Sequence, residues 1–109
     1  MHELAITESV VSAVAQRIGS ARVRRVVLEV GCLAAVVPEA MAFCFDICCE
    51  GTTLEGATLE IVPVPARGRC PQCATEVDVT DPLGGCACGS FVLDLMGGRD
   101  LRIKEVEVI

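Results

Sequence analysis

Aromatic residues are nearly absent from this chain of 109 residues. It contains no tryptophan, no tyrosine and three phenylalanines, although hydrophobic residues make up 52% of it. The core is therefore expected to be mainly aliphatic. Long apolar runs are also missing: the longest stretch without a charge, 82–93, has 12 residues and includes three glycines and a proline. Since a membrane-spanning helix needs about 20 consecutive apolar residues, we expect no transmembrane segment.

Basic residues are scarce, and a single histidine is present. The formal net charge is −6, and eight of the nine basic residues are arginine. Because phosphate binding needs a basic face, this balance argues against a nucleic-acid-binding protein. The chain also lacks the phosphate-binding pattern Gly-x-x-x-x-Gly-Lys and any evident nucleophile–base pair. We therefore do not expect an enzyme.

Cysteine is the residue type that is unusually common, with eight copies. The first residues lack the basic region of a secretory signal, and Glu8 interrupts the early apolar residues. We therefore expect no signal peptide and a cytoplasmic location. In a reducing compartment, clustered thiols bind metal more often than they form disulfides.

Two helices and three strands are expected outside the most cysteine-rich segment. Apolar residues recur with helical spacing over 4–18, and Gly19 follows as a stop signal. Pro38 and Glu39 suit the first turn of a second helix that ends at Gly51. Alternating patterns predict three strands, at 22–33, 57–64 and 101–109.

Residues 67–98 differ in composition from the rest of the chain. Glycine, proline and cysteine concentrate there, and the only continuous core-like run is Phe91-Val92-Leu93. So little apolar material does not hold a fold together by burial alone. We interpret this segment as an inserted module that depends on something else for its stability.

Four cysteines of the insert form two close pairs, Cys70-x-x-Cys73 and Cys86-x-Cys88. Two such pairs on separate turns can supply four thiolates tetrahedrally to Zn(II), at about 2.3 Å per Zn–S bond. In so small a module, metal binding becomes folding free energy. We predict a structural zinc site at these four residues, with no coordination position left open for catalysis.

Other interpretations of the motif remain open. Cys70 and Cys73 also fit a redox pair, although the strand-to-helix context of such a pair is missing. A rubredoxin-like iron site uses the same ligand types, and the four thiols can also be unligated. The second pair has one spacer residue instead of two, so its loop is tighter than the standard turn of a zinc ribbon.

The other four cysteines are Cys32, Cys44, Cys48 and Cys49. They lie on faces expected to be buried or near a helix end, and free cysteine packs as a small hydrophobic side chain. We expect them to fill the core. Cys44 and Cys48 are one helical turn apart, which leaves a shared metal as an alternative role.

The only histidine is at position 2, and a bulky second residue is expected to keep the initiator methionine in place. The Met1 amine, a backbone amide nitrogen and the His2 imidazole then form one short chelating segment. Nitrogen ligands in a square plane suit Ni(II) or Cu(II) better than Zn(II). Glu3 adds an oxygen, another backbone nitrogen or a supporting hydrogen bond. The alternative is a frayed, uninvolved terminus.

Taken together, these features resemble the HypA/HybF hydrogenase nickel-incorporation proteins. The likeness covers essentially the whole chain in the same order. Besides the cysteine module, it rests on Met1-His2-Glu3 before an amphipathic helix, a valine-rich strand ending in Gly31, Phe43-Cys44-Phe45-Asp46 and Arg102-Ile103-Lys104-Glu105-Val106. The one departure is the single spacer between Cys86 and Cys88, where the family pattern usually has two.

The resemblance implies an α+β fold, with a small three-stranded mixed sheet, two helices and an inserted zinc-ribbon-like module. It assigns residues 1–66 and 99–109 to a nickel-binding α/β domain and 67–98 to a zinc-binding module. The family's nickel-binding histidine corresponds to His2 and its neighbouring glutamate to Glu3. Its zinc ligands correspond to Cys70, Cys73, Cys86 and Cys88.

We therefore expect a cytoplasmic accessory protein that carries Ni(II), holds structural Zn(II) and is not an enzyme. By resemblance, its partners are a nickel-insertion accessory GTPase and the hydrogenase large subunit, with urease also served by some relatives. We expect neither nucleic acid nor membrane as a partner, and a monomer or a weak homodimer.

The main alternative is a zinc-ribbon adaptor for protein or nucleic acid. An adaptor of that kind needs a basic or aromatic face, whereas 70–98 contains no basic residue and one phenylalanine. A rubredoxin-like electron carrier is the other alternative, and iron would colour the purified protein.

Overall fold

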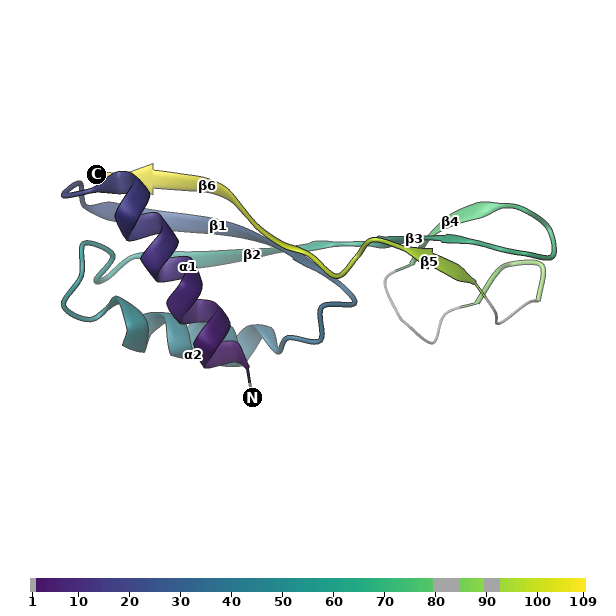
Figure 1. The fold of residues 1–109 in the computed structure, drawn as a ribbon, viewed down its shortest axis with the longest axis horizontal. Coiled ribbons are helices and arrows are strands. Elements are labelled where there is room, and N and C mark those ends of the chain that lie inside the picture. The colour runs from purple at the N-terminus through teal and green to yellow at the C-terminus, as the bar shows by residue number, and fades with distance from the viewer. Residues whose placement is uncertain (1, 80–84, 90–92) are drawn as a thin grey trace. The chain divides into compact units, whose positions relative to one another are not determined.

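The computed structural model describes residues 2–79, 85–89 and 93–109 (Figure 1). Its helices are α1 (Glu3–Ile18) and α2 (Pro38–Cys49). The strands of the described ranges are β1 (Val23–Gly31), β2 (Thr58–Val64), β3 (Ala66–Arg69), β4 (Glu76–Val79), β5 (Asp94–Met96) and β6 (Leu101–Val108). They form two sheets, ordered β2-β1-β6 and β4-β3-β5.

The elements expected outside the insert are confirmed: both helices and all three strands are present, with ends within two residues of those predicted. The α+β class is confirmed as well. The three short strands of the insert, β3 to β5, were not predicted. Within the described ranges, no helix is long and apolar enough to cross a bilayer.

The β2-β1-β6 sheet is mixed, and its β1–β6 pair is antiparallel. The backbone N–H of Gly31, at the end of β1, donates to the carbonyl of Asp100, which precedes β6. The N–H of Ile109, which follows β6, donates to the carbonyl of Arg22, which precedes β1. The two strands therefore run in opposite directions.

The β1–β2 pair of the same sheet is parallel. The N–H of Val23, at the start of β1, donates to the carbonyl of Thr53, which precedes β2. The N–H of Cys32, just after β1, donates to the carbonyl of Val64 at the end of β2. Because parallel neighbours need a long connection, α2 lies in the crossover between them.

Among the described residues, the core between the helices and this sheet is mainly aliphatic, as predicted, and Phe45 is its one aromatic side chain. Its largest fully buried side chains include Phe45, Leu28, Met41 and Leu54. On α2 the buried stripe is Met41, Phe45 and Cys49. Cys49, and not its neighbour Cys48, is the buried cysteine of this stripe. Residues spaced by four share a helix face, and Cys49 continues the series from Met41 and Phe45.

The prediction that all four remaining cysteines fill the core holds only for Cys49, which is 2% exposed. Cys32, Cys44 and Cys48 are half-buried. The thiol of Cys32 donates to the carbonyl of Val79 at 3.0 Å. Cys44 and Cys48 lie at the edge of the buried face of α2. An amphipathic helix buries only one stripe of its surface, and the cysteines of α2 extend beyond that stripe.

Charged side chains join the three strands of the β2-β1-β6 sheet at its surface. Arg25 on β1 contacts Glu60 on β2 at 3.1 Å, Glu105 on β6 at 3.3 Å and Glu107 on β6 at 3.4 Å. All four groups are substantially exposed, so each pair contributes little stability by itself.

By internal contacts, the chain divides into two compact units. One comprises Met1–Leu28, Val36–Ile61 and Ile103–Ile109, and the other Glu29–Ala35 and Val62–Arg102. The division falls within β1, β2 and β6, so each of these strands contributes residues to both units.

In the second unit, β3 is the central strand of a small antiparallel sheet. It pairs with β4 so that Ala66 lies opposite Val79, and with β5 so that Gly68 lies opposite Leu95. A Cβ at Gly68 would lie 2.9 Å from the Val79 side chain and 3.3 Å from that of Leu93. Glycine therefore lets Val79 and Leu93 close over the strand. Phe91 and Val92 of the predicted apolar run lie outside the described residues.

Candidate metal centre

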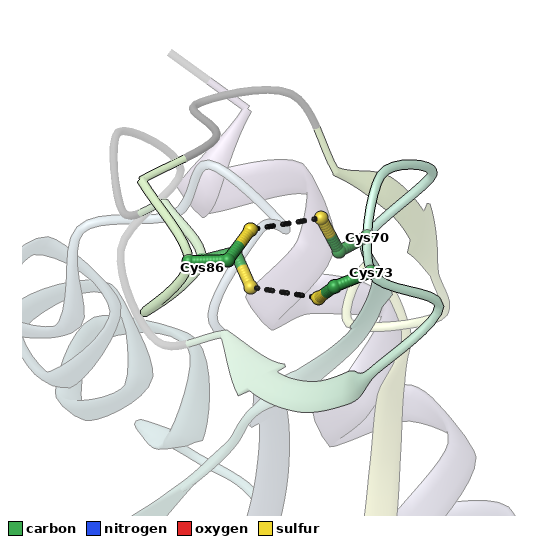
Figure 2. Close-up of side chains that lie close together, drawn as sticks. Cys70, Cys73 and Cys86 are labelled. Atoms are coloured by element: carbon green, nitrogen blue, oxygen red, sulfur yellow. Dashed lines mark hydrogen bonds between the residues drawn. The ribbon is translucent and has the colours of Figure 1, made fainter.

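Two turns of the second unit bring the four predicted zinc ligands together. Cys70 follows β3 directly, and Cys73 lies in the turn that leads into β4. Cys86 and Cys88 lie in a separate turn of the described segment 85–89. Figure 2 shows the two turns facing each other, with the sulfurs pointing into the space between them.

The sulfur geometry fits a tetrahedral metal. The sulfurs of Cys70 and Cys88 lie 3.6 Å apart, as do those of Cys73 and Cys86. All four sulfurs lie within 4.8 Å of one another. A regular tetrahedron with Zn–S bonds of about 2.3 Å has sulfurs about 3.8 Å apart. The four thiols are therefore spaced as a four-sulfur metal site requires.

Backbone hydrogen bonds shape the first turn around its cysteines. The N–H of Cys70 donates to the carbonyl of Thr75 at 2.9 Å, and the N–H of Ala74 donates to that of Cys70 at 2.8 Å. Ala74 has a φ of 61°, a left-handed conformation in which few residues with a side chain are found. The tight reversal places Cys73 back over Cys70.

The second turn closes despite its single spacer residue. The N–H of Gly89 donates to the carbonyl of Cys86 at 3.0 Å, and Gly89 has a φ of 100°. Glycine adopts this conformation at no steric cost. The sequence did not predict how two cysteines with one residue between them direct both sulfurs toward the first turn. In the structure, the turn closed by Gly89 gives them that direction.

The first turn also favours the thiolate forms that bind metal. The backbone N–H groups of Cys73 and Gln72 lower the pKa of the Cys70 thiol. Hydrogen bonds from the hydroxyl and the N–H of Thr75, and from Cys86, lower the pKa of the Cys73 thiol to about 6. Since thiolates are the ligating species, less free energy is needed to deprotonate these groups. Thr75 is a supporting residue that the sequence analysis missed.

The predicted nickel ligands lie at the start of α1, in the first unit. His2 is exposed and is the residue before the first turn of the helix, and its carbonyl accepts the N–H of Ile6 at 2.9 Å. Met1 lies outside the described residues. The first N–H groups of a helix have no partner within the helix, so the amide nitrogen of His2 is outside the helical ladder.

Glu3 is the buried member of this segment, with 8% exposure. Its carboxylate accepts a hydrogen bond from the backbone N–H of Val37 at 3.2 Å. Its own N–H, and then that of Val37, lower the pKa of the Glu3 carboxyl. The carboxylate thus holds the start of α1 to the start of α2, a contact over 34 positions that no local pattern in the sequence indicates.

Comparison with known proteins identifies the family. The family model for hydrogenase/urease nickel incorporation, metallochaperone, HypA, matches residues 1–108. The chain belongs to the HypA family. The hydrogenase maturation factor HypA of Nostoc punctiforme is 52% identical over 108 residues, which cover 99% of this chain and 96% of that protein. That of Geotalea uraniireducens is 47% identical over 109 residues, or 99% of each chain.

The fold is that of the HypA family too. The solution structure of the Ni metallochaperone HypA from Helicobacter pylori matches with a TM-score of 0.65 over 100% of this chain and 98% of that one, at 22% identity. The resemblance proposed from the sequence is confirmed. The HypA family is one of metallochaperones and maturation factors, not of known enzymes.

Proposed function

We propose that this chain is a nickel metallochaperone that binds Ni(II) through Met1, His2 and Glu3 and delivers it for maturation of [NiFe] hydrogenase. Membership of the HypA family supports the cargo and the pathway. The exposed position of His2 before the first turn of α1 is the structural observation that carries the proposal.

The chemistry of that position suits nickel. A square-planar site uses an imidazole, an amine and one or more deprotonated backbone nitrogens. A backbone nitrogen that bonds metal must lose its proton, which inside a helix would break a hydrogen bond. The N–H of His2, which precedes α1, has no intrahelical bond to lose. The imidazole of His2 is exposed, so it is accessible to incoming Ni(II) and to a receiving protein.

We propose that Glu3 positions the segment instead of donating its carboxylate as the main ligand. Its Oε2 is already engaged by the N–H of Val37. That hydrogen bond fixes where α1 begins, and therefore where His2 projects. A supporting group of this kind orients the groups that touch the metal.

We propose Zn(II) as the resident metal of Cys70, Cys73, Cys86 and Cys88, with 67–98 as the zinc-binding module. The sulfur spacing and the lowered thiol pKa values fit four thiolate ligands. Zn(II) bound there would supply folding free energy and, with four ligands, no open position for catalysis. Cys70 is fully buried, whereas Cys73 and Cys88 are exposed.

We propose a nickel-insertion GTPase and the hydrogenase large subunit as partners, in the cytoplasm. Members of the family are named hydrogenase maturation factors, which supports partners within that machinery. A reducing compartment keeps all eight thiols reduced, and none of them is in a disulfide.

The test is Ni(II) titration of the zinc-loaded protein with a native, untagged N-terminus. Calorimetry should give a nickel affinity that falls at least about tenfold in His2→Ala, because a ligand is lost. Ser9→Ala, an exposed change in the same helix, is the matched control and should bind as the wild type does. Equal affinities for His2→Ala and wild type would overturn the assignment of the nickel site.

The delivery function has its own measurement. Hydrogenase activity in cells that lack the endogenous gene should be restored by the wild type and not by His2→Ala at limiting nickel. Excess nickel should restore activity in the His2→Ala strain, because the chemistry of the enzyme itself is intact. If wild type fails to restore activity while its nickel affinity depends on His2, delivery to hydrogenase is wrong and the site is right.

A further inference from the structure

Two thiols of α2 have no role in the proposed nickel or zinc sites. Cys44 and Cys48 are both half-buried and lie one helical turn apart. Side chains four positions apart on a helix are neighbours, with Cβ atoms about 6 Å from each other. Both thiols border the buried stripe of α2, and Cys48 lies on the side that faces α1.

One of these thiols, that of Cys48, lines a groove between α1 and α2 together with polar side chains. Its lining includes Cys48 and Thr52 from the α2 side, and Glu8 and Ser12 from α1. The other lining residues are apolar, and no basic residue lines the groove. The groove therefore offers sulfur and oxygen donors and has no positive group of its own.

Glu8 and Cys48 line the same groove, and Cys44 lies one helical turn from Cys48 on α2. Burial, the carboxylate of Glu8 and the thiol of Cys44 together raise the pKa of the Cys48 thiol. No basic residue occurs in the last turn of α2 to offset the negative charge. Ionised together, the three groups repel, and a cation held between them would remove that repulsion.

We propose that Cys44 and Cys48, with Glu8 from the neighbouring helix, form a second metal site for a thiophilic divalent cation. Thiolate sulfurs select soft and borderline ions over Mg²⁺ or Ca²⁺, and a carboxylate completes a mixed sulfur–oxygen set. On binding, two S–H bonds break, two sulfur–metal bonds form and two protons pass to the solvent. No electrons are transferred.

The site differs from the four-cysteine cluster in its degree of preorganisation. Among the described residues, only the cluster has three or more ligand atoms already within 4.8 Å of one another. The carboxylate of Glu8 must therefore rotate toward the two sulfurs when the cation binds. An exchangeable site, weaker than the cluster, follows from that rearrangement.

Cobalt(II) added to the zinc-loaded full chain tests the proposal. Thiolate-to-cobalt charge transfer absorbs in the near ultraviolet, whereas nitrogen and oxygen ligands at the N-terminus give no such band. The wild type should show the band while its zinc content, measured by atomic absorption, stays unchanged. Cys44→Ser and Cys48→Ser should each lose most of the band, and Glu8→Gln should need more cobalt to reach it.

Two matched controls separate this site from the others. Cys32→Ser removes a half-buried thiol of the other unit and should leave the band intact. His2→Ala should also keep it, so failure of the nickel site and failure of this one are distinguishable. Absence of the band in zinc-loaded wild type would overturn the proposal. So would a full band in the double variant Cys44→Ser/Cys48→Ser whose helical circular dichroism is unchanged.

Discussion

The carboxylate of Glu3 accepts a hydrogen bond from the backbone N–H of Val37, with 3.2 Å between Oε2 and N. Val37 is the residue before the first turn of α2, where backbone N–H groups lack partners within the helix. The chain begins α1 with a residue whose side chain caps a second helix 34 positions later. Positioning of the proposed nickel segment and stability of α2 therefore depend on one contact.

Replacing Glu3 by glutamine tests the stabilising part of this contact. The pKa of the Glu3 carboxyl lies below its ordinary value of 4.5. A carboxyl whose pKa is lower in the folded than in the unfolded protein raises the free energy of unfolding at pH values above its unfolded-state pKa. That contribution is lost as the pH falls through its folded-state pKa. Glu3→Gln should therefore be less stable than wild type at pH 7, and the difference should shrink below about pH 4.

Urea unfolding followed by helical circular dichroism at the two pH values measures this difference. Glu50→Gln, which removes an exposed carboxylate just after α2, is the control and should change stability little at either pH. A Glu3→Gln difference that is as large at acidic pH as at neutral pH would contradict the assignment of the effect to the ionised carboxylate.

Thr75 should control the ionisation of Cys73. Its hydroxyl and N–H are the largest influences that bring the pKa of that thiol to about 6. Thr75→Val keeps the shape and the N–H but removes the hydroxyl. In the folded, zinc-loaded protein, the pH profile of zinc release should move to higher pH in Thr75→Val, because protons compete better for a thiolate of higher pKa. Thr75→Ser should restore the wild-type profile, and an unmoved profile in Thr75→Val would show that the hydroxyl is unimportant.

Gly97 and Gly98 form a natural pair for separating backbone strain from steric overlap. Both have positive φ, 70° and 78°. A Cβ on Gly97 meets nothing within 4 Å, whereas a Cβ on Gly98 would overlap the side chain of Ala66 at the start of β3. Gly97→Ala should cost about 1–2 kcal/mol from the left-handed backbone alone. Gly98→Ala should cost ~1–3 kcal/mol more because of overpacking.

Denaturant unfolding of the zinc-loaded protein, monitored within the second unit, gives both values. The comparison is internal because the two residues are adjacent and have similar positive φ angles. Equal destabilisation by the two substitutions would mean that the close approach of Gly98 to Ala66 is not maintained in solution.

The features predictable from the sequence are those encoded locally. Pro38 predicts the first position of α2, because the N–H that proline lacks would have no partner within the helix at that position. In the structure, α2 begins at Pro38. The spacing Cys70-x-x-Cys73 likewise identified the ligand cluster, since each pair is held by its own turn. Family membership was recognisable for the same reason: its motifs are short and occur in order.

The features that could not be predicted depend on contacts between residues far apart in the sequence, or on which residues at the edge of a helix's apolar stripe become buried. β3 and β4 read ARGR and EVDV, and four residues with at most two large apolar side chains are too short a pattern to predict a strand. The contact of Glu3 with Val37 joins separate helices, and the hydrogen bonds of Thr75 to Cys73 require the folded turn. Cys48 and Cys49 are adjacent and about 100° apart around the helix axis, and only the packing of α2 shows that Cys49 is the buried one.

Metal removal should unfold the small sheet of the second unit while leaving α1 and α2 folded. β3, β4 and β5 are only three or four residues long, and β5 is exposed throughout. Their buried residues in the described ranges, Ala66, Cys70 and Val79 among them, provide little apolar burial. Structural zinc sites contribute about 10–16 kcal/mol of apparent binding free energy in small zinc-finger domains, which far exceeds that burial.

Amide hydrogen exchange before and after chelation measures the loss residue by residue. The N–H groups of Cys70 and Ala74 are hydrogen-bonded in the first metal-binding turn and should lose their protection when the metal is removed. Those of Val11 and Val14, in the buried part of α1, should keep it. Cys73→Ser should reproduce the pattern without chelator, while Cys32→Ser should not. Continued protection of the Cys70 and Ala74 N–H groups in the metal-free protein would contradict this prediction. It would show that the hydrogen bonds of the turn are enough to fold it without a metal.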